Sequence, residues 1–161
     1  MTESQRQLVL DLALGRIDRP TLCERFGVDL GDPQATVDLL SQAYETGNGE
    51  DVECAIIVAA AFGYSREHVR VLNALLLETW HTRHEDVALA LEELHDASSV
   101  DALFQAALFE LPYLDYDENY GLARKRTWAL AKIGTPESHA KLRSLAECDN
   151  QIIRAYALKR L

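Results

Sequence analysis

The sequence predicts an all-α fold, a right-handed α-solenoid of four to five helical hairpins, and three observations lead to it. A short phrase recurs: ALEEL begins at Ala90, ALAKI at Ala129 and ALKRL at Ala157. The apolar residues that close the units recur at spacings of 32, 32, 39 and 28 residues: Leu30, Phe62, Leu94, Ile133 and Leu161. No stretch alternates with period two for long enough to form a strand. A phrase that returns at a near-fixed interval indicates stacked repeats, and such arrays usually bind other molecules.

The spacing of apolar side chains predicts the helices of the first half in order. A helix over 3–14 ends at Gly15, and a short helix opened by Asp18 and Pro20 stops at Gly27. A helix over 33–46 is followed by a turn, since Thr46-Gly47-Asn48-Gly49 supplies two glycines that can take positive φ. Apolar residues then predict helices over 51–62 and 65–80.

The second half continues with helices over 85–95, 99–111, 120–133 and 136–147, and a last one from about residue 150. Three helix starts carry N-cap residues, because the side chains of Asp32, Ser65 and Thr135 can accept from unpaired helix amides. Pro33 and Pro136 then occupy the first helical position, where a missing N–H does no harm.

The second helix of each predicted pair contains an alanine, and helix packing explains why a small residue is needed there. Adjacent helices of a stack approach closely, and a small side chain permits this approach. We expect these alanines to lie at the packing contacts: Ala59, Ala90, Ala129 and Ala157.

The repeats divide the chain into one domain over residues 1–161. Residues 1–29 form a degenerate N-terminal cap, and the repeats run approximately over 30–62, 63–94, 95–133 and 134–161. A chain of 161 residues fits a single domain, and 48% hydrophobic residues are enough for its core.

The unit from Arg126 to Glu137, with the copy that begins at Arg154, resembles short bacterial HEAT-like repeats of the phycobilisome-lyase type. The resemblance is good over 117–161, fair over 30–116 and absent over 1–29, and it concerns scaffold residues. In HEAT-like proteins the second helix of each pair lines the concave surface. The resemblance therefore implies a concave acidic strip made by these residues: Glu53, Glu85, Asp86, Glu92 and Glu93. The alternative is a solvated helix face.

The net charge of −10 hides an asymmetry, because residues 1–120 carry −16 and residues 121–161 carry +6. This acidity argues against a nucleic-acid partner, which needs a basic face, and favours a basic protein partner. The alternative is that the acidic and basic ends of the chain match one another.

The 39-residue spacing implies about seven extra residues near the segment 111–120. Insertions in solenoids tend to lie on the working face, and tyrosine is favoured at binding hot spots. The predicted partner-binding residues of this segment are Tyr113, Asp115, Tyr116, Asp117, Glu118 and Tyr120. The alternative is a loop in which Tyr113 and Leu114 tuck under solvated acids.

No pattern of residues predicts catalysis, a cofactor or a metal. His81, His84 and His95 lie near acids, yet metal sites need three or four converging ligands, so we expect surface histidines. The three cysteines have no metal spacing, and Cys54 is expected to be packing material.

Two further sets of residues are expected to be structural. Arg126 and Arg154 are preceded by Asp117 and Asp149, which favours Arg–Asp pairs between repeats. Trp128 and Tyr156 share a column with Leu89 and Ile57, interpreted as core in preference to an exposed patch. The uncapped C-terminal repeat, which ends at Leu161, allows self-association.

The function expected is a non-enzymatic protein-binding module with an acidic recognition surface. Its sharpest form is an immunity protein that neutralises a basic toxin domain, a class that short acidic HEAT-like proteins resemble. The alternatives are an assembly or regulatory adaptor, whose interface includes Trp128, Tyr156 and the basic tail, and a lyase-like subunit. With no long apolar run and no signal-peptide pattern, the expected location is cytoplasmic, away from membranes.

Overall fold

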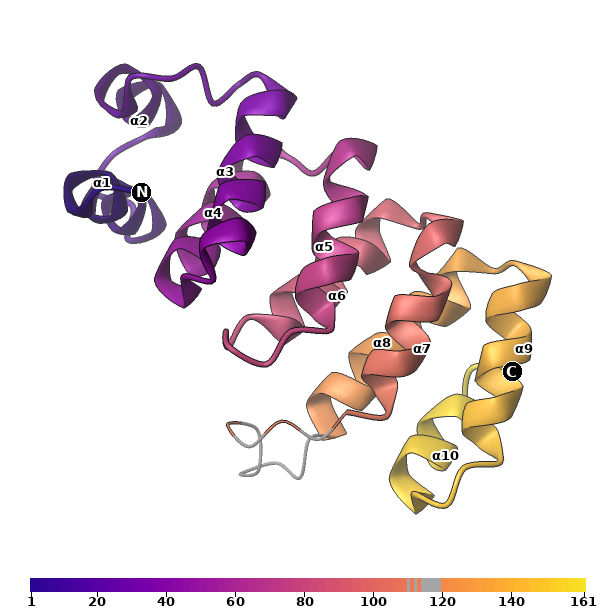
Figure 1. Ribbon diagram of the computed structural model, residues 1–161. Coiled ribbons are helices and arrows are strands. Elements are labelled where there is room, and N and C mark those ends of the chain that lie inside the picture. Colours follow the sequence, from indigo (N-terminus) through magenta and orange to yellow (C-terminus); the bar gives the residue numbers. More distant parts are fainter. Residues whose placement is uncertain (110, 112, 114–119) are drawn as a thin grey trace. The chain divides into compact units, whose positions relative to one another are not determined.

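The computed structural model describes residues 1–109, 111, 113 and 120–161, and all regular structure in these ranges is helical (Figure 1). The all-α prediction is confirmed. The chain divides into two compact units, the first formed by Met1–Val71 and Trp80–Arg83, the second by Leu72–Thr79 and His84–Leu161. The repeat boundaries proposed above stay a prediction.

The first unit contains α1 (Glu3–Ala13), α2 (Arg19–Phe26), α3 (Pro33–Thr46), α4 (Gly49–Phe62), the short 3₁₀ helix η1 (Arg66–His68) and the start of α5 (Val69–Leu76). Helix α1 packs against α2 and α4, and α3 packs against α4. A cluster of buried side chains joins α1, α2, α4 and the segment before α3: Leu8, Val9, Leu22, Phe26, Leu30, Cys54 and Val58. The expectation that Cys54 is packing material is confirmed.

The second unit holds the remainder of α5, then α6 (His84–Leu94), η2 (Ala97–Ser99), α7 (Val100–Ala107), α8 (Tyr120–Ile133), α9 (Pro136–Ala146) and α10 (Gln151–Leu158). Helix α8 packs against α7, α6 and α10, while α9 packs against α10 and α7. Within this unit α6, α8 and α10 therefore form one layer, and α7 and α9 lie in the other (Figure 1).

The helix starts predicted at Asp32 and Thr135 are confirmed. The Asp32 carboxylate and the Thr135 hydroxyl accept hydrogen bonds from amides in the first turns of α3 and α9, at 3.0 and 3.1 Å. Pro33 and Pro136 are the first residues of these helices, and Ser65 precedes η1. The four alanines predicted at packing contacts are all buried: Ala59, Ala90, Ala129 and Ala157.

Two helices end earlier than the apolar pattern predicts. The helix expected over 65–80 begins as η1 and ends at Leu76, and the helix expected over 99–111 ends at Ala107. After each end, two successive amides bond to the carbonyl three residues back, a 3₁₀ pattern that tightens and closes the last turn. Trp80 consequently lies outside any helix.

Among the described residues, no helix combines the length and the apolar character needed to cross a membrane.

A buried carboxylate fastens α1 to the start of α4. Asp51 accepts a hydrogen bond from the amino group of Met1 at 2.7 Å and another from Nε of Arg6 at 2.8 Å. Burial by itself raises the pKa of Asp51, but the hydrogen bonds and charges of its two cationic partners outweigh burial, so the pKa is lowered. The ionised carboxylate is therefore a stabilising contact.

Replacing Asp51 with asparagine is expected to lower the free energy of unfolding by about 2 kcal/mol at pH 7, because two cations lose their counter-ion. A lowered folded pKa gives stability that is complete above the unfolded pKa of about 3.9 and is lost as pH falls through the folded value. Urea denaturation from pH 7 to pH 3 should show the gap between the two proteins closing below about pH 4. The exposed Asp149→Asn substitution is the control; a gap that is as large at pH 3 as at pH 7 contradicts the assignment.

Candidate functional site

A groove runs along the exposed side of α3 in the first unit. Its volume is about 650 Å³, and its lining residues are Val28, Asp32, Gln34, Ala35, Asp38, Leu39, Ser41, Gln42 and Glu45. Three of these residues carry carboxylates and none is basic. Val28, Ala35 and Leu39 supply apolar surface between the acids. The groove therefore combines negative charge with apolar contact area.

The carboxylates of the groove are available to pair with a cationic partner. Asp32, Asp38 and Glu45 are exposed, and within the described ranges no lysine or arginine forms an ion pair with them. Asp38 accepts a hydrogen bond from the Gln34 side chain at 2.7 Å, which orients it along the helix. These residues are absent from the predicted site. The sequence does contain a signal for this site, because the helix predicted over 33–46 has a polar face opposite its apolar face.

A buried histidine holds the first turn of α3 in place. The Ser65 amide donates to Nδ1 of His68 at 3.1 Å, so Nε2 carries the ring proton and points to the Thr36 hydroxyl at 3.0 Å. The Thr36 hydroxyl in turn donates to the carbonyl of Pro33 at 2.8 Å. Desolvation lowers the pKa of His68, partly offset by the charge of Glu67. This hydrogen-bond chain ties η1 to the helix that carries the groove.

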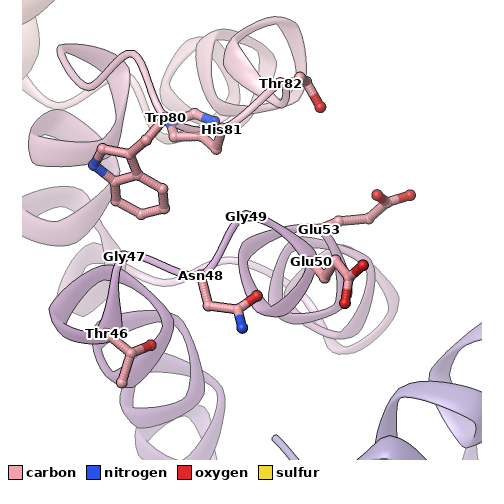
Figure 2. Close-up of a pocket in the computed structure, with 9 residues that line it drawn as sticks. All are labelled: Thr46, Gly47, Asn48, Gly49, Glu50, Glu53, Trp80, His81 and Thr82. Atoms are coloured by element: carbon pink, nitrogen blue, oxygen red, sulfur yellow. The ribbon is translucent and has the colours of Figure 1, made fainter.

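A second hollow, of about 490 Å³, lies where α3 turns into α4 (Figure 2). Figure 2 shows the Trp80 indole on one side of the Gly47–Gly49 turn and the carboxylates of Glu50 and Glu53 on the other. A Cβ on Gly49 would lie 3.3 Å from the carbonyl oxygen of Trp80, which explains the glycine there. Trp80 is 37% exposed, so this hollow also presents an aromatic surface beside acids.

The acids predicted on α6 are largely engaged within the second unit. Glu85 forms an ion pair with Lys125 at 3.3 Å, and Glu92 forms one with Lys132 at 2.7 Å, both lysines lying on α8. Glu93 is exposed and Asp86 is half-buried. Glu53, in the first unit, pairs with Arg83. The pairs on α6 follow the alternative in which the acidic and basic parts of the chain match one another.

Most of the segment predicted to bind a partner lies outside the described residues: Asp115, Tyr116, Asp117 and Glu118. Tyr120 begins α8. Tyr113 is described, and its hydroxyl lies 2.9 Å from Nδ1 of His84, in a hydrogen bond. Burial raises the pKa of Tyr113 to about 12, so the hydroxyl stays protonated at neutral pH.

Two of the three histidines expected at the surface are buried. His81 is held by the amide of Arg83, which donates to its Nδ1 at 3.1 Å. His84 lies at the start of α6, and its Nε2 contacts the carbonyl oxygen of Glu78 at 2.5 Å. The surface prediction is wrong for both, because each ring satisfies main-chain groups of the turn that it closes. His95 is exposed, as expected.

Of the two predicted Arg–Asp pairs, the Arg154–Asp149 pair is replaced by bonds to the main chain, whereas Asp117, the predicted partner of Arg126, lies outside the described residues. Arg154 donates to the carbonyl oxygens of Cys148 and Asp149 at 3.0 and 3.2 Å, so the carboxylate of Asp149 is not its acceptor. Arg126 donates from Nη1 to the carbonyl oxygen of Ala106 near the end of α7. A guanidinium suits both positions because a carbonyl oxygen near a helix end can accept a further hydrogen bond.

The column interpreted as core is in part a surface. Leu89 is 53% exposed and Trp128 is 39% exposed, so the core interpretation is wrong for both. The buried face of α8 is formed instead by other residues: Leu122, Ala123, Arg126, Thr127, Ala129 and Leu130. The guanidinium of Arg160 lies 3.7 Å from the centroid of the Trp128 ring, a cation–π contact on the exposed side.

Within the described part of the chain, no three histidine, cysteine or acidic side chains converge in a metal-binding group. The three cysteines are free thiols.

No protein-family model, curated protein or solved structure matches the chain. The resemblance to HEAT-like repeats therefore stays a prediction, and the functional argument depends on the geometry of the described residues.

Proposed function

We propose that this protein is a non-enzymatic binding module that recognises a basic protein partner through the acidic groove on α3. The observation that carries the proposal is the contrast between two sets of acids. Glu85 and Glu92 are paired with lysines, whereas the three acids of the groove are exposed and have no cationic partner among the described residues. Among the described residues, no ion pair competes for these carboxylates.

The apolar residues of the groove indicate how a basic side chain fits. Lysine and arginine bury their aliphatic stems on apolar surface while their charged heads pair with acids. Val28 and Leu39 offer such a surface, and Asp38 and Glu45 lie two helical turns apart at its edge. Unpaired carboxylates also accelerate encounter with a positive partner, and this effect weakens as salt is added.

We extend the proposal to the arrangement of the helices. The hairpins α3–α4, α7–α8 and α9–α10 are members of one right-handed α-solenoid of HEAT-like type. Support comes from the shared Asp-Pro and Thr-Pro helix starts and from the two layers within the second unit. An array of this kind offers a broad face, and a standard interface needs about 800 Å² on each partner.

The narrower hypothesis is that the partner is a toxin domain and that the module is an immunity protein. It is supported by size and net charge alone. In this hypothesis the carboxylates of the module cover the basic surface with which the toxin domain otherwise binds nucleic acid.

The experiment is affinity capture from the native host with the wild-type protein and with a double Asp38→Lys, Glu45→Lys variant. We expect basic proteins captured by the wild type to bind the variant at least about tenfold more weakly, because two attractive contacts become repulsive. Their association rate with the wild type should fall steeply with added salt. Quantitative mass spectrometry and surface plasmon resonance make these measurements.

The matched control reverses the charge of two exposed acids, Glu137 at the start of α9 and Glu147 directly after its end, by the substitutions Glu137→Lys and Glu147→Lys, with the same change of net charge. Equal loss in both variants indicates a nonspecific charge effect and contradicts a site on α3. Undiminished binding by the α3 variant contradicts it as well.

The exposed Trp128 favours a second candidate, an adaptor that binds through its basic C-terminal part. Trp128→Ala in the same capture experiment distinguishes the two, since the adaptor loses its partner in this variant and the α3 site does not.

A further inference from the structure

The hollow at the turn from α3 to α4 is a second recess of the first unit (Figure 2). Its volume of about 490 Å³ suits a small molecule. All of its lining residues are described, and no lysine or arginine is among them. The buried ring of His81 is neutral, because its Nδ1 accepts the Arg83 amide at 3.1 Å. The charges on the walls of this hollow are therefore negative, and they come from Glu50 and Glu53.

Trp80 supplies an aromatic wall that its neighbours hold in place. It lies outside any helix and is 37% exposed. Its carbonyl oxygen would lie only 3.3 Å from a Cβ on Gly49, so the two main chains approach closely. Its ring meets the ring of His81 edge-on at 5.3 Å, and the ring of Tyr44 lies 6.4 Å away. A large apolar ring is thus fixed at the edge of a polar hollow.

Two carboxylates lie across the turn from this ring (Figure 2). The Glu50 side chain is 79% exposed, and its nearest oxygen lies 3.9 Å from Nε of Arg6, beyond hydrogen-bond distance. That nitrogen donates instead to Asp51 at 2.8 Å. Glu53 pairs with Arg83, so much of its charge is compensated. Glu50 is therefore the carboxylate of the hollow that can accept a further cation.

An aromatic face beside a carboxylate suits an organic ammonium ion. The cation is attracted to the negative face of the ring, and indole attracts it most strongly. A metal ion needs three or four converging ligands, more than two carboxylates supply.

Methylation of the ammonium ion improves the match. A primary ammonium needs acceptors for three N–H groups. The side-chain oxygens of Thr46 and Asn48 already bond to main-chain groups, at 2.9 and 3.0 Å. A methylated ammonium needs few acceptors, because its charge is spread over methyl groups that pack on the ring.

We propose that this hollow binds a methylated ammonium cation, which lies between the Trp80 ring and the Glu50 carboxylate. The cation is either a free small molecule or the side chain of a methylated lysine in another protein. The site shares no lining residue with the groove on α3, so the two proposals stand or fall separately. With one aromatic wall, we expect a dissociation constant on the order of a few millimolar.

The first arm of the test uses choline chloride as the probe. Saturation-transfer NMR of its methyl protons detects millimolar binding and needs no reporter in the protein. The wild type should give a saturable signal. The neutral analogue of choline, in which carbon replaces the nitrogen, has the same shape and should bind at least about tenfold more weakly, because only the charge differs.

Three variants locate the site. Trp80→Leu should weaken choline binding at least about tenfold, and Glu50→Gln by about threefold. Trp128→Phe is the matched control, since Trp128 is 39% exposed but belongs to the second unit, where Arg160 already lies on its ring. This control should bind choline like the wild type. Circular dichroism checks the fold, and the exposed Glu50 keeps the test decisive if Trp80→Leu does not fold.

The second arm identifies the source of the cation with a library of short peptides, each with one trimethyl-lysine in varied flanking sequence. A protein source gives peptides that bind at least about tenfold more tightly than choline and that lose this affinity with unmodified lysine. A free small molecule as the source gives no such peptide. The proposal is overturned if choline gives no saturable signal up to about 50 mM, if its neutral analogue binds equally well, or if Glu50→Gln and folded Trp80→Leu bind it like the wild type.

Discussion

Replacing Ala129 with leucine is expected to destabilise the protein by about 3 kcal/mol, because the added atoms have no space between α8 and its neighbours. Ala129 is fully buried, and α8 packs against both α6 and α7 in the second unit. For a chain of this length such a loss lowers the thermal midpoint by about 9 °C. Differential scanning calorimetry measures the shift.

The control is Ala155→Leu, on the exposed side of α10. It makes the same chemical change in a helix and is expected to alter the free energy of unfolding by less than about 0.5 kcal/mol. If Ala129→Leu changes the free energy of unfolding as little as the control does, the packing of α8 does not depend on a small side chain at this position.

The recurring alanines show which part of the fold could be predicted from the sequence. Burial at Ala59, Ala90, Ala129 and Ala157 follows from a repeated local pattern, and so do the helix starts at Asp32 and Thr135. Caps, prolines and apolar spacing act over a few residues, so one sequence contains them in full. The early ends of α5 and α7 were missed, because neither a glycine nor a proline directly follows Leu76 or Ala107 to mark the end of the helix.

The candidate site was less predictable, since pairing between distant residues decides which acids remain available. Glu92 and Asp38 are alike in sequence, both lying on amphipathic helices. Only the packing of α6 against α8 brings Lys132 to Glu92, whereas no ion pair among the described residues engages Asp38. Counting charges along the sequence reveals an excess of acidic residues, but it does not show on which surface the unpaired carboxylates lie.

The burial of histidines was the other feature that the sequence did not predict. Histidine is intermediate between surface and core in its preferences, so neither His68 nor His84 has a local signature of burial. Each lies beside a turn whose main-chain groups its ring satisfies. His68 can be tested most sharply, because all its partners are described and lie in the first unit.

Replacing His68 with leucine is expected to lower the free energy of unfolding by about 3 kcal/mol at pH 7.5. The change removes the acceptor of the Ser65 amide and the donor to Thr36 in a fully buried place. Thr36→Val, which removes only the hydroxyl, should cost about 1–2 kcal/mol. The double variant should lose about 1 kcal/mol less than the sum of the losses of the two single variants, because both substitutions remove the same hydrogen bond between His68 and Thr36.

The same histidine gives the first unit a pH dependence of definite sign. Its folded pKa is lowered by burial, so the unfolded chain binds a proton more readily than the folded one. The contribution of the neutral ring is complete above the unfolded pKa of about 6.5, and it falls by at most about 1.4 kcal/mol per pH unit below that value until the folded pKa is reached. Urea denaturation between pH 7.5 and pH 5 should therefore show a steeper loss in the wild type than in His68→Leu. Parallel profiles would mean that the folded pKa of His68 equals its unfolded value, and a relative gain of the wild type at low pH would mean a protonated folded ring; either result contradicts the buried neutral ring.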